Sequence, residues 1–331
     1  MIVGLKSECS DLQDSSIDIP VARNARVGDP SLQPPRQGLG TVAAAALEGM
    51  RPYQWLKNVL VFTPLAAAHR IADWALLVNA AGAFIAFSLT ASALYLVNDL
   101  RDVAADRAHP HKRNRPIASG RLPAPVAIVT TCLVVLGAAV IAVTVSPRLA
   151  ATLSFYFVLM LVYTFWLKAI VLLDVFVLAI GYGLRIIAGS VAVGIAPSSR
   201  LLAFSVFLFV SLALIKRYAE LTLLRLRDGN TAHARGYQLA DQQFILALGV
   251  TCGGLSVLVL ALYLGTTDID RAYSRSQLIW FTCGLLLYWI SHLWLMAHRG
   301  RMTDDPLVFA IKDRVSVALI SLMALSAWLA V

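Results

Sequence analysis

The chain has 331 residues, of which 59% are hydrophobic and 14% are charged. A soluble domain carries about 25% charged residues, so this composition excludes an ordinary soluble protein and predicts a polytopic membrane protein. The formal net charge of +9 would suit a nucleic-acid-binding protein, but the basic residues are scattered over short segments that flank apolar runs. That distribution is typical of membrane orientation, so nucleic acid is excluded as a partner.

Residues 1–49 differ from the rest of the chain. They are polar, with mixed charge and several Pro, Ser and Gly residues, and they contain no apolar run that resembles a secretory signal. This composition predicts a disordered cytoplasmic tail. Residues 50–331 are predicted to form a single transmembrane catalytic domain.

Apolar runs of membrane-spanning length occupy most of residues 50–331. They lie at residues 53–69, 74–97, 125–145, 149–167, 172–194, 201–219, 242–264, 277–297 and 314–331. If the N-terminus is cytoplasmic, the inward connections hold nearly all of the Lys and Arg residues, as the positive-inside rule requires. The sequence therefore predicts an all-α, multi-pass protein of the cell (inner) membrane, with nine transmembrane helices around a polar cavity that faces the cytoplasm.

Residues 98–124, NDLRDVAADRAHPHKRNRPIASGRLPA, connect the second and third predicted spans. Asp99, Asp102 and Asp106 are three and four residues apart, a spacing that places them on one helical face, and Asn98 precedes Asp102 by four. Neighbouring carboxylates repel one another, so a divalent cation is their natural counterion. Mg2+ suits them best, because it takes one or two carboxylates and completes its shell with substrate phosphate oxygens. We predict that these aspartates bind Mg2+, with Asn98 in support.

Basic residues follow the acidic cluster directly. Lys112 and Arg115 are candidates to hold a substrate phosphate or diphosphate, because acid followed by base suits a metal bound to a polyanion. An ordinary basic cytoplasmic loop is the alternative. The helical phase of the acids, continuous with the preceding apolar helix, favours a site.

Other inward-facing ends of the predicted spans also carry polar residues, which lipid excludes unless they line a wet cavity. The candidates for that cavity wall are Lys57, Asn58, Tyr163, Lys168, Arg185, Lys216 and Glu220. Structural alternatives remain open for several of them. Lys57 can snorkel to the interface, Asp174 can pair with Arg185, and Lys216 can pair with Glu220 one helical turn away.

Two further interpretations concern the remaining polar residues. The segment Thr303-Asp304-Asp305-Pro306 is interpreted as a capped helix start and a solvated turn. A carrier with Asp174 and Arg185 along an ion path is the alternative from another functional class. The polar residues gather at one membrane face, and this favours catalysis over transport.

These patterns resemble the UbiA superfamily of intramembrane prenyltransferases over about residues 45–331. The resemblance rests on the nine spans, on residues 51–58, and on the N-D-x-x-D-x-x-x-D signature at residues 98–106 with its basic run. Most members carry a second acidic motif after the sixth helix, where this chain has Lys216-Arg217-Tyr218-Ala219-Glu220. That departure, together with YTFWLK and DDPLVFAIKDR, resembles the branch that transfers phosphoribose to decaprenyl phosphate.

This resemblance implies a Mg2+-dependent phosphoribosyltransferase that acts on phosphoribosyl diphosphate and a polyprenyl phosphate in the bilayer, in the synthesis of the lipid-linked arabinose precursor of cell-wall polysaccharide. The cavity-wall candidates would hold the substrate phosphates and ribose. A homo-oligomer is plausible within the family. The alternative enzyme is a prenyltransferase that acts on an aromatic or other small acceptor, and the missing second acidic motif disfavours it.

Overall fold

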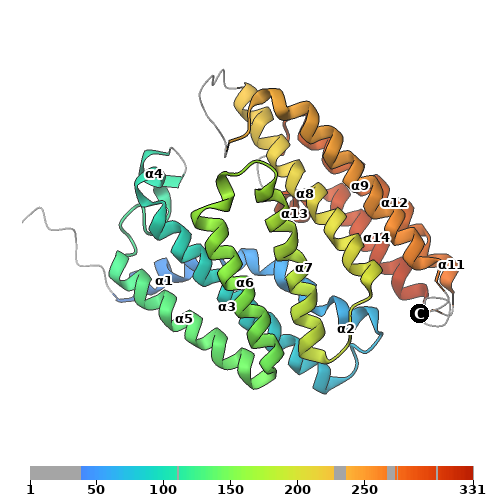
Figure 1. The fold of residues 1–331 in the computed structure, drawn as a ribbon, viewed down its shortest axis with the longest axis horizontal. Coiled ribbons are helices and arrows are strands. Elements are labelled where there is room, and N and C mark those ends of the chain that lie inside the picture. The colour runs from blue at the N-terminus through green and yellow to red at the C-terminus, as the bar shows by residue number, and fades with distance from the viewer. Residues whose placement is uncertain are drawn as a thin grey trace, which may run out of the picture. The chain divides into compact units, whose positions relative to one another are not determined.

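The structure is a computed structural model that describes residues 39–109, 112–226, 236–266, 273, 275–302 and 305–330. All regular elements in these ranges are helices, as the sequence predicts, and the long ones lie side by side (Figure 1). In chain order they are α1 (Leu39–Met50), η2 (Pro52–Phe62), α2 (Thr63–Ala67), α3 (Trp74–Arg101), α4 (Val103–Ala108), η3 (Lys112–Asn114), α5 (Ala124–Val145), α6 (Pro147–Phe165), η4 (Leu167–Ala169), α7 (Leu173–Val193), α8 (Ser199–Leu226), η5 (Leu239–Asp241), α9 (Gln242–Leu264), α11 (Ser276–Ile279), α12 (Phe281–His298), α13 (Pro306–Lys312) and α14 (Arg314–Ala330).

Seven helices in the described part of the chain are long and apolar enough to cross a membrane. They begin at residues 74, 124, 147, 173, 199, 239 and 277, close to seven of the predicted spans. The last predicted span is the shorter apolar helix α14, of 17 residues. The predicted count of nine is therefore not confirmed, although the all-helical membrane class is.

The first predicted span, residues 53–69, is not one long helix. The eleven-residue 3-10 helix η2 is followed by the five-residue helix α2. Proline occupies the first turn of each, where it fits because its missing N–H needs no partner. The polar stretch that contains Lys57 and Asn58 therefore lies on a short, tightly wound element at the edge of the cavity described below.

Helix α1 occupies residues that the sequence analysis assigned to the disordered tail. Its alanine-rich sequence favours a helix, and its buried residue Ala45 packs with Leu96 of α3 and Leu122. Arg121 also binds Glu48 of α1 through both of its terminal nitrogens, at 2.6 and 2.8 Å. The predicted disorder is thus wrong for the end of this segment, whereas residues 1–38 lie outside the described residues.

Helix α7 lies between two hydrophobic clusters. One cluster is centred on α8 with α9 and α12, and the other joins α3, α6 and α7. At Gly189, a Cβ atom would collide with the backbone carbonyl of Val61, so only glycine lets η2 pack this closely on α7. This close approach brings η2, with Lys57 and Asn58, beside the polar face of α7.

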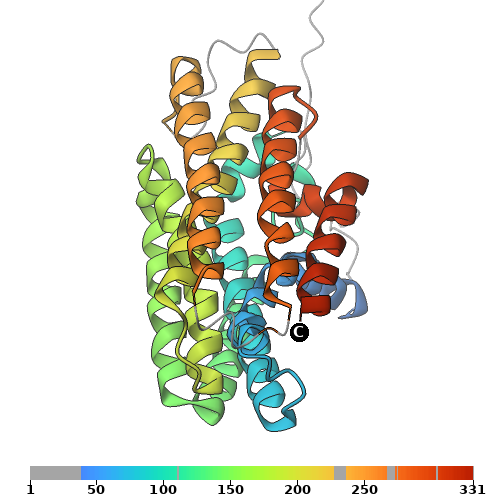
Figure 2. The ribbon, with the colours of Figure 1, turned by 90° about the vertical axis from the view of Figure 1, so that its right-hand side faces the viewer.

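At the C-terminal end of the chain, the start of α13 lines this cavity, and α12 and α14 pack nearby. Helix α14 lies beside α12, and the short helix α13 contacts α8 (Figure 2). Asp305 caps α13 by accepting a hydrogen bond from the backbone N–H of Leu307 at 3.2 Å, as the sequence predicts. This cap places the start of α13 over the inner face of α8.

Candidate active site

A cavity of about 310 Å³ lies among η2, α3, α6, α7, α8 and the start of α13. Its charged lining residues are the cations Arg51, Lys57, Arg115, Arg185 and Lys216 and, within the described part of the chain, the single carboxylate Asp305. Clustered cations at the wall of a partly enclosed site repel one another, and bound anions relieve that repulsion. The cavity is therefore suited to a ligand that carries several negative charges.

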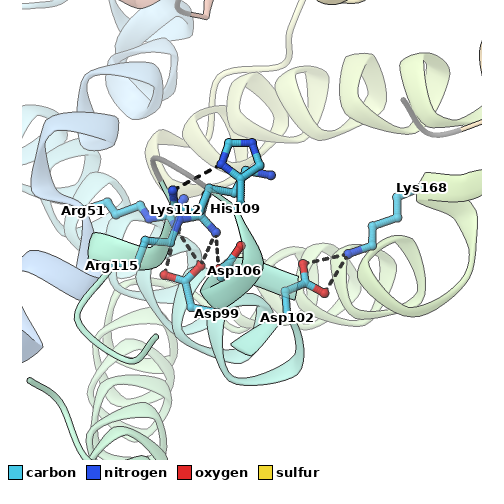
Figure 3. Close-up of polar contacts among 8 residues, drawn as sticks. All are labelled: Arg51, Asp99, Asp102, Asp106, His109, Lys112, Arg115 and Lys168. Atoms are coloured by element: carbon cyan, nitrogen blue, oxygen red, sulfur yellow. Dashed lines mark hydrogen bonds and ion pairs between the residues drawn. The ribbon is translucent and has the colours of Figure 1, made fainter. Parts of the chain in front are cut away.

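Two of these lining cations, Arg51 and Arg115, point toward the acidic cluster (Figure 3). The carboxylate of Asp99 accepts hydrogen bonds from Arg51 at 2.6 and 2.8 Å and from Arg115 at 3.2 Å. Arg115 also binds Asp106 at 2.7 Å, and both carboxylates are buried. The guanidinium of Arg115 thus bridges Asp99 and Asp106. Its positive charge offsets the repulsion between the two carboxylates.

Asp102 does not share this arrangement, although its spacing predicts the same helical face. Asp102 is the residue between α3, which ends at Arg101, and α4, which begins at Val103. Its carboxylate turns toward Lys168, which lies 3.0 Å away (Figure 3). The prediction of three carboxylates on one continuous face is therefore wrong at Asp102.

The donor set can be tested for its fit to Mg2+. Within the described residues, no group of three or more His, Cys, Asp or Glu side chains is close enough to hold a metal ion. Asp99 and Asp106 nevertheless share one cationic partner, at 3.2 and 2.7 Å. Two convergent carboxylates beside a polar cavity fit Mg2+, which takes one or two carboxylates and fills its shell with water and phosphate oxygens.

Two lysines that line the cavity meet at one carboxylate. Lys57 of η2 binds the carboxylate of Asp305 at 2.8 Å, and Lys216 of α8 lies 3.5 Å from the same oxygen. Burial acts to raise the pKa of Asp305, but the positive charges of Lys57 and Lys216 outweigh it and hold that pKa below its ordinary value. Asp305 therefore stays ionised and occupies the place of an anion between two lysines.

Arg185 lies deeper in the cavity and has a different kind of environment. Its Nε donates to Asn58 Oδ1 at 2.8 Å, and its Nη1 donates to the carbonyl of Gly181 at 2.6 Å. Its Nη2 donates to the hydroxyl of Tyr156 at 3.3 Å. All of these partners are neutral, so the guanidinium keeps its positive charge without a carboxylate beside it.

The alternative pair of Asp174 with Arg185 is not present, because Asp174 has other partners. Arg217 of α8 donates from Nε to Asp174 at 2.7 Å, and the hydroxyl of Tyr237 donates to its other oxygen at 2.6 Å. Burial, together with the hydrogen bond to Asp174, raises the pKa of Tyr237, so its hydroxyl keeps the proton that it donates. Arg217 also binds Glu220. This buried network turns away from the cavity and joins α7 to α8.

The cavity brings together six of the residues singled out by the sequence. These are Lys57, Asn98, Arg115, Tyr163, Arg185 and Lys216. Asp99, Asp106 and Asn58 are in contact with these or other lining residues. Lys112 is exposed and Lys168 pairs with Asp102, so neither lines the cavity. Glu220 binds Arg217 and Lys216 turns to Asp305, so the expected alternative pair of Lys216 with Glu220 is replaced.

The sequence analysis missed two charged residues of the site. Arg51 has a left-handed backbone conformation (φ 53°) at the junction of α1 and η2, and from there its side chain reaches Asp99. Asp305 is interpreted from the sequence as part of a capped helix start and a solvated turn; the cap is present, but the side chain is 17% exposed and lines the cavity, so the solvated turn is wrong for this residue. In each case a charge directly before proline is the available signal, at the start of the first predicted span for Arg51 and in the loop between the last two predicted spans for Asp305. The partners, however, are 48 and 248 residues away, respectively, beyond what local spacing can indicate.

Comparisons with known proteins place the chain in a family. The model of the UbiA prenyltransferase family matches residues 59–299. The chain is 37% identical over 285 residues to nodulation protein NoeC of Azorhizobium caulinodans, which covers 84% of this chain and 90% of that protein. It is 36% identical over 307 residues to decaprenyl-phosphate phosphoribosyltransferase of Mycobacterium tuberculosis, with coverage of 90% and 95%.

A third relative is longer than this chain. Protein y4nM of Sinorhizobium fredii is 36% identical over 272 residues, which is 82% of this chain but 52% of that protein, so the chain spans about half the length of this relative. Among solved structures, a UbiA homolog from Archaeoglobus fulgidus bound to GPP and Mg2+ has a similar fold, with a TM-score of 0.63, 14% identity, and coverage of 86% of this chain and 98% of that chain. The family match, the extent of the relatives and the apolar helices together show that this chain is an integral membrane protein of the UbiA prenyltransferase family.

Proposed function

We propose that this protein transfers 5-phosphoribose from phosphoribosyl diphosphate to a polyprenyl phosphate and releases diphosphate, at the cytoplasmic face of the cell membrane. Its product would be a lipid-linked precursor of arabinose for cell-wall polysaccharide, as the name of the mycobacterial relatives suggests for the transfer step. The orientation with a cytoplasmic N-terminus rests on the distribution of Lys and Arg.

The cationic wall of the cavity is the observation that carries this proposal. Lys57 and Lys216 converge on Asp305, and Arg185 lies beyond them without a carboxylate partner. A phosphate monoester carries a charge of about −1.5 to −2 at neutral pH, so two phosphorylated substrates bring more negative charge than one prenyl diphosphate with a neutral acceptor. Lysine and arginine side chains that line one cavity beside a single acidic cluster favour the doubly phosphorylated pair.

The reaction breaks the bond between C1 of ribose and the diphosphate oxygen, and the diphosphate leaves with the electron pair. An oxygen of the lipid phosphate forms the new bond to C1. No general base is needed, because that phosphate is already anionic at neutral pH. The protein accelerates the reaction by positioning two anionic substrates and compensating their charge. No single side chain has to act as an acid, a base or a nucleophile.

Asp99 and Asp106 would hold Mg2+, and Asp102 would join them by exchanging its ion pair with Lys168 for the metal. When bound, the metal supplies charge stabilisation to the leaving diphosphate. Arg51 and Arg115 keep the two buried carboxylates oriented through hydrogen bonds of 2.6 to 3.2 Å. Lys57 and Lys216 line the same cavity, where they can contact phosphate groups of the donor.

The test is a transfer assay with purified protein, labelled phosphoribosyl diphosphate, a polyprenyl phosphate and Mg2+. We expect a labelled product that extracts into organic solvent. A chelator should abolish its formation, and Asp99→Asn or Asp102→Asn should reduce the rate by at least about 100-fold, the size of effect seen when charge stabilisation is removed. Asp73→Asn is the matched control, because Asp73 caps the opposite end of α3 and Asn caps equally well.

Assays on the same purified protein distinguish this reaction from the alternative prenyl transfer. Transfer of a prenyl chain from a prenyl diphosphate to an aromatic acid, with no transfer of ribose, would replace this proposal with the other UbiA-type reaction. Full activity of Asp99→Asn would remove the acidic cluster from the reaction altogether.

A further inference from the structure

Arg185 differs from the other arginines around the cavity in the charge of its partners. Arg51 and Arg115 each bind a carboxylate at 2.6 to 3.2 Å. Arg185 is 7% exposed and, among the described residues, has no Asp or Glu within ion-pair distance. A charge without a counterion is costly in a membrane helix. Because Arg185 lines a cavity, a negatively charged ligand can supply that counterion.

The guanidinium of Arg185 is held in a fixed position. It lies 4.8 Å from the ring centre of Phe87, 5.4 Å from that of Tyr156 and 5.0 Å from that of Tyr182. Three of its five N–H groups donate to neutral oxygens, which leaves two. The planar guanidinium is already oriented by these aromatic rings and hydrogen-bond acceptors, so it loses little conformational entropy when it binds phosphate.

The depth of Arg185 indicates which phosphate it receives. Lys168, just before α7, contacts Asp102, just after α3, so the start of α7 and the end of α3 lie together. Arg185 is twelve residues beyond the first residue of α7, Leu173, or about 18 Å along the helix. The acidic cluster is therefore at the mouth of the cavity, and Arg185 is deeper in the membrane.

Apolar side chains line part of the same cavity. The lining includes Ala91, Leu94, Met160, Leu178, Leu212 and Ala213. A wholly polar ligand such as phosphoribosyl diphosphate gains nothing from such a wall. A phosphate attached to a hydrocarbon chain matches both the cation and its apolar surroundings.

We propose that Arg185 is the receptor for the phosphate monoester headgroup of the lipid acceptor, and that its neutral partner Asn58 keeps it free of a competing carboxylate. This inference rests on the proposed function, because it assigns one of the two substrates to a subsite. It predicts that the donor and the acceptor depend on different residues: the donor on the acidic cluster and the lysines, and the acceptor on Arg185.

Binding can be measured without catalysis, using farnesyl phosphate and its neutral counterpart farnesol on the purified full-length protein in detergent. Wild type should bind the phosphate more tightly than the alcohol. Arg185→Gln should lose at least about tenfold of the affinity for farnesyl phosphate, the range for loss of a charge-assisted phosphate contact. Its affinity for farnesol and for phosphoribosyl diphosphate with Mg2+ should not change. Arg200→Gln, an exposed arginine at the start of α8, is the charge-matched control.

Asn58→Asp gives a second, independent test. It places a carboxylate at the position of Oδ1, 2.8 Å from Nε, so Arg185 remains and is held more firmly, but its charge is neutralised. We expect a similar loss of affinity for farnesyl phosphate. A purely structural role of Arg185 would be preserved or strengthened in this variant, and so it would leave that affinity intact.

The outcomes separate this inference from the proposed function. If wild type neither binds farnesyl phosphate nor transfers phosphoribose, both are overturned. If wild type transfers phosphoribose while Asn58→Asp and Arg185→Gln keep their preference for the phosphate over the alcohol, only the assignment of Arg185 is overturned. A loss of donor affinity in place of acceptor affinity would assign Arg185 to the donor and would likewise overturn it.

Discussion

Two buried arginines on neighbouring helices show how partners, more than burial, distinguish a binding residue from a structural one. Arg217 of α8 binds the carboxylates of Asp174 and Glu220, and its side chain packs in the core. Arg185 of α7 binds neutral oxygens and faces the cavity. The charge of the first is satisfied within the protein, whereas the charge of the second is available to a ligand.

The same comparison separates their energetic roles. A buried ion pair adds little to stability relative to well-packed apolar residues, but loss of one partner leaves an uncompensated charge and costs about 3–5 kcal/mol. Replacement of Arg217 should therefore affect mainly folding. Replacement of Arg185 should affect mainly ligand binding, because removal of a charge without a carboxylate partner leaves no carboxylate unpaired.

The largest effect is expected for Arg217→Met. It leaves Asp174, which is fully buried, with only the hydroxyl of Tyr237 as a partner, so stability should fall by about 3–5 kcal/mol. Thermal unfolding in detergent, followed by circular dichroism, measures the change. The double variant Arg217→Met with Asp174→Leu removes both fully buried charges and leaves Glu220, which is 36% exposed, so it should recover most of the loss. A double variant no more stable than the single one would show that the pair is not the cause.

A smaller effect is expected for Asp305→Asn, where one carboxylate lies between two cations. Asn preserves the cap of α13 but leaves Lys57 and Lys216 without their anion. In wild type, a phosphate must displace Asp305 from these lysines. The variant should therefore bind inorganic pyrophosphate with Mg2+ more tightly, by about 1.5 kcal/mol or about tenfold, the lower range for hydrogen bonds to charged groups. Calorimetry measures the affinity. Equal or weaker binding would show that Asp305 does not compete with the ligand.

The sequence predicts the helical class and most spans because long apolar runs leave few alternatives in a membrane. Asp99 and Asp106 share the guanidinium of Arg115, in agreement with their spacing, since seven residues return a side chain to nearly the same helical face. The prediction is wrong at Asp102, whose carboxylate pairs with Lys168, 66 residues away in the sequence. Helical periodicity places side chains on one face, but a partner from another segment decides where each of them turns.

Ion-pair partners are harder to predict than helices, since they depend on packing between segments far apart in the chain. Asp174 and Arg185 share a helical face but are eleven residues, or about 16 Å, apart along the axis. Arg217 on the adjacent helix is 43 residues away in sequence and yet within 2.7 Å. The wall formed by Lys57, Lys216 and Asp305 likewise follows from the packing of η2, α8 and α13, which local spacing does not encode.

The smallest effect is expected at Arg121, an arginine that binds a carboxylate at the surface. Arg121 and Glu48 are 48% and 51% exposed, so solvent screens their pair and Glu48→Gln should cost at most about 1 kcal/mol. The hydrogen bond from Arg121 lowers the pKa of Glu48 below its ordinary value of 4.5. The contribution is therefore fully present above pH 4.5 and is lost as the pH falls through the lowered pKa of the folded state. Hydrogen exchange of the α1 amides should show faster opening in Glu48→Gln at pH 7, a difference that high salt reduces. An equal difference at high salt would mean that packing of the side-chain stem, and not charge, ties α1 to the bundle.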